Sequence, residues 1–194
     1  MKKVIKRINK QKVASHIDIF AKALMENGKP TGLNLNIENF LHGIVENNLP
    51  ANELEGHIHD LMRVAINGQL QQTENVLRYF LGRGIGSTPA GDDHVIGLLG
   101  IHALTGTLHP DFIQTVKHLT ETESITTRAG LYYLHHALDG EFLPPFARIL
   151  DNLEAGERNN LQEQISQVLP IGHTSGIDTI FGMLIGMWNI KNKP

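Results

Sequence analysis

The chain has 194 residues, of which 41% are hydrophobic and 19% are charged, a balance typical of a soluble globular protein rather than a disordered one. Its formal net charge of -3 gives no electrostatic reason to bind nucleic acid. The absence of cysteine excludes disulfides, thiol catalysis and cysteine-bound metals. No apolar stretch reaches the roughly 20 residues that a membrane span requires. We therefore expect a cytoplasmic protein that binds neither membranes nor nucleic acid.

The first predicted segment is basic. Residues 1–12 contain six cationic side chains, Lys2, Lys3, Lys6, Arg7, Lys10 and Lys12. No apolar stretch of signal-peptide length follows them, so we expect a solvated N-terminal segment that frays. The rest of the chain contains no linker, which predicts a single domain over residues 1–194.

Helical periodicity dominates the remaining sequence. Apolar residues recur at spacings of three and four in five segments: residues 13–24, 54–65, 112–119, 142–153 and 161–168. Turn signals such as Asn27-Gly28 and Asp139-Gly140 separate the segments. The alternation of Leu33, Leu35 and Ile37 is too short to build a sheet. The pattern predicts an all-α fold of about nine or ten helices.

Two segments depart from the amphipathic pattern. Residues 95–104 and 177–188 are apolar almost all round, as expected for helices that are buried on every side. Each carries closely spaced glycines, which cost a helix about 1 kcal/mol against alanine and therefore indicate close backbone contact. We expect these two helices to lie at the centre of the fold.

A similar polar, glycine-containing loop precedes each of the two apolar helices. The first contains Gly91-Asp92-Asp93 and the second Gly176-Ile177-Asp178. A further glycine follows four residues after Asp93 and four residues after Asp178. Thr88 is predicted to cap the first helix, with Pro89 at its first position, and Thr174 or Ser175 to cap the second. The unpaired N–H groups at each helix start then predict a site for phosphate or carboxylate.

A purely structural interpretation competes with this one. Acids are favoured in the first turn of a helix, and glycines are common in turns, so single residues here are as well explained by structure as by function. Two polar loops that each lead into a fully buried helix are harder to explain by packing alone. The constellation as a whole favours a functional site.

The first loop also carries a family resemblance. The stretch Gly82-Arg83-Gly84-Ile85-Gly86-Ser87-Thr88-Pro89-Ala90-Gly91-Asp92-Asp93 resembles the signature of a bacterial family that includes the AllH-type subunit of oxamate carbamoyltransferase, from anaerobic allantoin degradation. Thr126-Thr127 and residues 172–178 match further features of that family in order. Arg83, Ser87 and Gly130 depart from its usual residues, as in a short, divergent member.

The resemblance implies a subunit of an enzyme that moves a carbamoyl group between oxamate and phosphate. Its partners would be an acyl-CoA-synthetase-like subunit and another large subunit. Such a transfer needs a cradle for an anion, donors to the carbonyl oxygen and a base for the attacking amide.

The catalytic candidates are His173, which is the predicted general acid or base, and Asp93 and Asp178, which would position a base or bind Mg²⁺. No other cofactor is indicated. The candidates for binding the substrate or anion are Arg83, Gly84, Gly86, Ser87, Thr88, Gly91, Asp92, Thr126, Thr127, Arg128, Gly172, Thr174, Ser175 and Gly176.

Two other functions stay open on the sequence. A non-catalytic scaffold subunit that binds a small carboxylate or phosphate needs the same loops. A metal-dependent phosphohydrolase is suggested by His42, His57, His59-Asp60 and Asp92, although His57 and His59 are two residues apart and so do not share a helix face.

Overall fold

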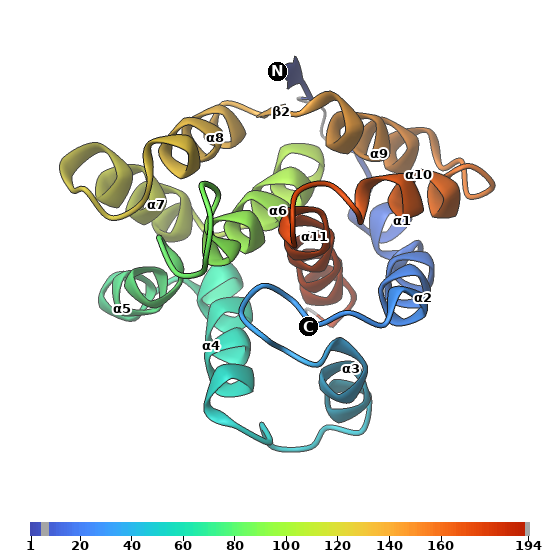
Figure 1. The fold of residues 1–194 in the computed structure, drawn as a ribbon, viewed down its shortest axis with the longest axis horizontal. Helices are drawn as coiled ribbons and strands as arrows, with labels where there is room; N and C mark the ends of the chain where they lie inside the picture. The colour runs from blue at the N-terminus through green and yellow to red at the C-terminus, as the bar shows by residue number, and fades with distance from the viewer. Residues whose placement is uncertain (5–7, 193–194) are drawn as a thin grey trace.

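Two helices, α6 (Ala90–Thr105) and α11 (Ser175–Lys191), form the centre of the protein, and the other helices surround them (Figure 1). This computed structural model describes residues 1–4 and 8–192. The surrounding elements are β1 (Lys2–Lys3), α1 (Lys10–Ala14), α2 (Ile17–Asn27), α3 (Ile37–Val45), α4 (Glu53–Asn67), α5 (Leu70–Phe80), α7 (Pro110–Thr122), α8 (Arg128–Leu138), β2 (Glu141–Phe142), α9 (Pro144–Ala155) and α10 (Leu161–Val168). The predicted all-α fold is confirmed.

Helices α6 and α11 are buried on every side, as their apolar sequences predict. Their backbones approach each other at two glycines. A Cβ atom on Gly97 would collide with the carbonyl oxygen of Thr179, and one on Gly182 with the carbonyl oxygen of His94. Only glycine allows this contact, because any side chain would push the two helices apart.

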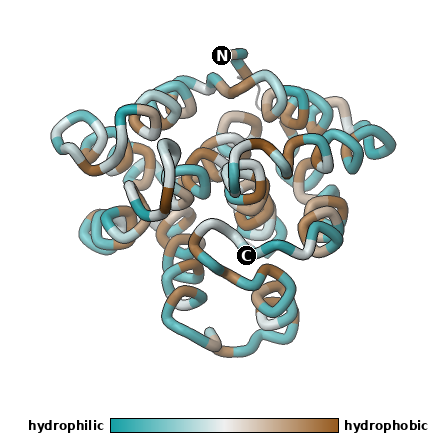
Figure 2. Tube along the Cα trace, in the orientation of Figure 1, coloured by the Kyte–Doolittle hydropathy of each residue, from teal (hydrophilic) through white to brown (hydrophobic). Residues whose placement is uncertain are grey.

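The outer helices turn an apolar face toward this pair. Figure 2 shows hydrophobic residues gathered toward the middle of the molecule and hydrophilic residues around its outline. Burial of such faces is what stabilises short helices, which are marginal by themselves in water. Among the described residues, no helix has both the length and the apolar character needed to cross a bilayer.

Two predicted helices have different limits in the structure. The periodic segment 13–24 is divided between α1 and α2, because the ring of His16 hydrogen-bonds the carbonyl oxygen of Lys12 at 2.8 Å and the chain turns there. Phe142 belongs to β2 rather than to the following helix, which begins at Pro144. A proline suits the first turn of a helix and favours an extended residue before it.

Part of the basic N-terminal segment is paired with the rest of the chain. Lys2 lies opposite Phe142 and Lys3 opposite Glu141 in an antiparallel two-stranded sheet. The N–H of Val4 donates to the carbonyl oxygen of Gly140 at 2.7 Å. Lys6 and Arg7, which the sequence assigns to the same segment, lie outside the described residues.

Candidate functional site

The two glycine-containing loops meet in the structure. The hydroxyl oxygens of Thr88 and Ser175, one from each loop, lie 2.8 Å apart. A pocket of about 230 Å³ opens beside them, and its walls include Ser87 and Gly172 as well as Asp93 from the first turn of α6. Two segments 87 residues apart in the sequence therefore form one site.

The first helix begins one residue later than predicted. Pro89, rather than Thr88, occupies the capping position of α6, and no side chain caps the helix. The hydroxyl of Thr88 pairs with Ser175 instead. The N–H of Gly91 donates to the carbonyl oxygen of Arg83 at 2.9 Å, so one of the donors expected to bind an anion is used within the protein.

The second helix begins in a comparable way. Thr174 stands at the capping position of α11 but makes no capping hydrogen bond through its side chain. The N–H of Gly176 donates to the carbonyl oxygen of Ile171 at 3.0 Å. Both helix starts are thus partly closed by their own loops, which leaves fewer free N–H groups than the sequence suggests.

Asp92 binds the protein with both of its carboxylate oxygens. Oδ1 accepts the N–H of Gly82 at 2.8 Å, and Oδ2 accepts the hydroxyl of Thr126. The side chain is fully buried, which raises its pKa to about 6 against the opposing effect of these two donors. Thr127 strengthens the same connection by donating to the carbonyl oxygen of Ser87 at 2.5 Å. Asp92, Thr126 and Thr127 therefore fasten the first loop to α8.

Asp93 differs from Asp92 in the hydrogen bonds of its carboxylate oxygens. It is 5% exposed and lines the pocket, and its Oδ2 atom has no hydrogen-bond partner among the described residues. Burial raises its pKa to about 8; the Ser175 hydroxyl opposes this rise, and the charges of Asp178 and Asp92 add to it. A carboxyl group in this state is neutral for much of the time near pH 7, and it both donates and accepts hydrogen bonds.

Asp178 connects the second loop to a third segment. Its Oδ1 atom accepts the N–H of Gly32 at 2.8 Å. A Cβ atom on Gly32 would collide with Thr174 Oγ1 and lie too close to Asp178 and Ala90, so only glycine fits between the starts of α6 and α11. This segment comes from the N-terminal third of the chain, to which no sequence motif assigned a role. Asp178 does not line the pocket.

His94 is a buried polar residue that the sequence analysis did not select. Its Nδ1 atom lies 2.5 Å from the carbonyl oxygen of Ala90 and 3.8 Å from Asp178 Oδ1. Its Nε2 atom has no partner among the described residues. Burial raises the pKa of Asp178, and the nearby His94 lowers it. The signal that could have identified it is its position directly after two aspartates, at the start of an apolar run.

Several predicted binding residues lie away from the pocket. His173 is exposed and does not line it, and neither Arg83 nor Arg128 does. The guanidinium group of Arg83 stacks on the ring of Tyr79, 3.8 Å from its centre, and donates to the Tyr79 carbonyl oxygen at 2.7 Å. Of the described residues that line the pocket, none is Lys, Arg or His. The predicted general acid or base, His173, therefore does not line this pocket, and its role stays a prediction.

Two of the histidines suggested for a phosphohydrolase, His57 and His59, contact different aromatic side chains. His57 stacks on Tyr79, with 3.5 Å between ring centres, whereas His59 lies edge-on to Phe40 at 5.5 Å. Within the described ranges, no group of three or more His, Asp or Glu side chains is arranged to hold a metal ion. Mg²⁺ binding by Asp93 and Asp178 stays a prediction.

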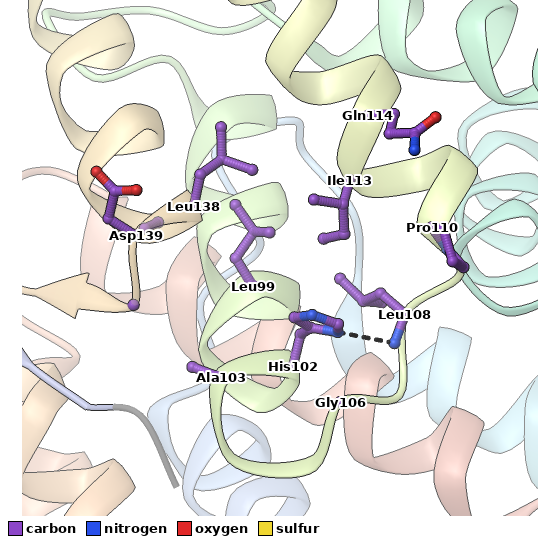
Figure 3. A pocket seen from close by; sticks show the side chains of 12 residues that line it. Leu99, His102, Ala103, Gly106, Leu108, Pro110, Ile113, Gln114, Leu138 and Asp139 are labelled. Carbon is purple, nitrogen blue, oxygen red and sulfur yellow. Dashed lines mark hydrogen bonds between the residues drawn. The ribbon is translucent and has the colours of Figure 1, made fainter. Parts of the chain in front are cut away.

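A larger cavity of about 560 Å³ lies toward the other end of α6, between α6, α7 and α8 (Figure 3). Its walls are mainly apolar, with Leu99, Ile113 and Leu138 among them. The Nδ1 atom of His102 accepts the N–H of Leu108 at 3.0 Å. None of the site residues predicted from the sequence lines this cavity.

The geometry defines a helical protein whose two central helices begin at one pocket lined by hydroxyl and carboxyl groups. Residues 80–187 match the family described as oxamate carbamoyltransferase subunit AllH. The match covers more than half of the chain and includes both loops, α6, α8 and most of α11. The chain therefore belongs to this family, as the loop signature predicts. No solved structure matches the chain.

Proposed function

We propose that this chain is a subunit of an enzyme that transfers a carbamoyl group between oxamate and phosphate, with carbamoyl phosphate as the donor, and that the pocket at Asp93 binds the amide end of the substrate. One observation carries the proposal. Both loops of the family match meet at a single pocket that Asp93 lines, and the buried Oδ2 atom of Asp93 has no hydrogen-bond partner among the described residues. An unsatisfied buried carboxyl group is costly unless a ligand binds it.

The chemistry of the walls favours an amide over an isolated anion. Thr88, Ser175 and Thr179 supply hydroxyl groups, and each of these both donates and accepts hydrogen bonds. An amide has N–H donors and a carbonyl acceptor, so it pairs with these groups and with Asp93. An anion alone would instead meet Asp93 and Glu141 with no cationic side chain in the described walls. The pocket volume of about 230 Å³ is smaller than the roughly 300–1,000 Å³ of pockets that bind drug-sized ligands, so the pocket suits a smaller ligand.

The same groups account for the transfer step. The amide nitrogen of oxamate attacks the carbamoyl carbon, its N–H proton passes to the Asp93 carboxylate, and phosphate leaves as the C–N bond forms. A carboxylate whose pKa is raised is a stronger base than an ordinary aspartate, which suits this role. In this proposal the hydroxyls of Thr88 and Ser175, which both line the pocket, donate to the carbonyl oxygen as negative charge develops on it.

A binding-only role is the second candidate, and the position of His173 favours it. The one histidine of the second loop is exposed and outside the pocket, so the described pocket offers Asp93 as its base without a histidine beside it. In this case the chain would hold the amide while another subunit supplies the catalytic groups.

Calorimetric titration of the purified chain tests the binding site. Oxamate should bind the wild-type chain and the His173→Asn variant equally, and should bind Asp93→Asn at least about tenfold more weakly, because the substitution removes one acceptor at the pocket wall. Inorganic phosphate alone should bind none of them measurably. Equal affinity in Asp93→Asn, or a loss confined to His173→Asn, would contradict the assignment.

Kinetics of the reconstituted enzyme then separate the two roles. If Asp93 is the base, Asp93→Asn lowers kcat about 100-fold or more. If the pocket only holds substrate, the same variant raises KM and leaves kcat close to the wild-type value.

A further inference from the structure

We propose that the pocket at Asp93 prefers an amide that carries a short branched hydrocarbon in the position where oxamate has its carboxylate. The inference rests on the proposed function, since it names the class of substrate that the same pocket selects. It is carried by the side chains of the pocket that the amide end does not use, which are mainly apolar.

The polar and apolar residues of the pocket come from different parts of the chain. The hydroxyl groups belong to the loop before α6 and to α11. The apolar residues come mainly from the segment that runs from β2 into α9, with Phe142, Leu143 and Phe146, and from Ile171 before the second loop. Helix α9 contacts α6, which contributes Ile96 to the pocket. These five residues form the apolar wall of the pocket.

Two members of the apolar wall are held by the backbone and still present surface to a ligand. Leu143 and Ile171 are half-buried. The carbonyl oxygen of Leu143 accepts the N–H of Ala147 at 2.9 Å, and the carbonyl oxygen of Ile171 accepts the N–H of Gly176 at 3.0 Å. A fixed apolar surface inside a pocket favours an apolar group of the ligand, because contact removes both from water.

The charges of the pocket disfavour a carboxylate beside this wall. The charged side chains among the described residues that line the pocket are Asp93 and Glu141, and both are carboxyl groups. Glu141 is held in place by His136, whose Nδ1 atom lies 2.7 Å from Glu141 Oε2. A ligand carboxylate would lose hydration against the apolar wall without gaining a cationic partner, and it would meet a like charge at Glu141.

Isobutyramide and oxamate are a matched pair of probes for this preference. Isobutyramide keeps the amide of oxamate and carries an isopropyl group, of similar shape, in place of the carboxylate. In calorimetric titrations of the wild-type chain, isobutyramide should bind at least about tenfold more tightly than oxamate, because the wall buries its two methyl groups. Oxamate binding as tightly as isobutyramide, or more tightly, would overturn the inference and leave the proposed amide site in place.

Variants of the apolar wall locate the hydrocarbon. Leu143→Lys places a cation there and should lower the preference for isobutyramide over oxamate at least about tenfold. Leu54→Lys is the matched control, because Leu54 is also half-buried near the start of a helix but does not line the pocket, and it should keep the wild-type ratio. Ile171→Lys replaces Leu143→Lys if circular dichroism shows that the latter does not fold. An unchanged ratio in the folded wall variant would overturn the inference.

Isobutyrate separates this inference from the proposed function, because it keeps the hydrocarbon and lacks the amide. The wild-type chain should not bind it measurably. If isobutyrate binds as tightly as isobutyramide and Leu143→Lys changes both affinities, the apolar wall stands and the proposed amide site fails. If neither amide binds the wild-type chain, the proposed function and the inference that rests on it both fail.

Discussion

Asp92 and Asp93 are neighbours at the start of α6, but the regions that surround them differ. On the side of Asp92, the loop and α8 supply a donor to each carboxylate oxygen. On the side of Asp93, the second loop and the pocket leave Oδ2 without a partner among the described residues. Both side chains are buried, so the difference lies in the hydrogen bonds and not in exposure.

Under the proposed function, this difference separates the structural carboxylate of Asp92 from the ligand-binding carboxylate of Asp93. Two donors stabilise the charged form of Asp92, which keeps the rise in its pKa to about 6. Without comparable donors, the pKa of Asp93 rises to about 8, and its neutral form prevails near neutral pH. A saturated carboxylate holds elements together, whereas an unsaturated one beside a cavity is available to a substrate.

The largest expected effect comes from removing the Asp92 carboxylate. In Asp92→Ala, the buried N–H of Gly82 and the hydroxyl of Thr126 lose their acceptor, so the free energy of unfolding should fall by about 3–5 kcal/mol. Urea denaturation followed by circular dichroism measures this loss. The interpretation of Asp92 as a structural residue is wrong if Asp92→Ala unfolds at the wild-type denaturant concentration.

Asp93→Asn should raise the free energy of unfolding, whereas Asp92→Ala lowers it, and the size of this increase should depend on pH. Because the pKa of Asp93 is raised on folding, the folded wild-type chain binds an extra proton between about pH 4 and pH 8 and loses stability as pH rises through this range. Asparagine does not ionise. The variant should therefore be more stable than wild type above pH 8, by a few kcal/mol in order of magnitude, and the gap should close toward pH 4.

Thermal and urea unfolding at pH 5, 7 and 9 measure this gap, with Asp18→Asn as a control at an exposed aspartate that pairs with Arg158. A gap that stays constant across these three values would show that Asp93 does not titrate in this range. A variant less stable than wild type at pH 9 would contradict the burial of an unpaired carboxyl.

The fold was predictable because it depends on local patterns. Periodic apolar residues located most of the helices, and the two all-apolar runs correctly identified α6 and α11 as the central pair. The two helices whose limits differ from the prediction also depend on local features. Predicting Phe142 as helical ignored Pro144, and the break near His16 depends on a side-chain bond to Lys12 that periodicity does not report.

The candidate site was predictable only in part. The repeated loop pattern led to Asp93, Thr88 and Ser175, which meet at the pocket. It did not reveal Gly32, because a contact between segments so far apart in the chain leaves no local sequence pattern. It also selected His173, which does not line the pocket, since residue type and loop position do not show which way a side chain points; its catalytic role stays a prediction.

The most direct test of the central claim is a carboxyl ¹³C NMR titration of the wild-type chain with and without oxamate. One aspartate carboxyl, absent from the spectrum of Asp93→Asn, should titrate near pH 8 and shift when oxamate is added. A second, assigned to Asp92 through the Asp92→Asn variant, should titrate near pH 6 and not respond to oxamate. If the Asp93 carboxyl titrates near its ordinary value of about 4, or ignores oxamate, the account is contradicted.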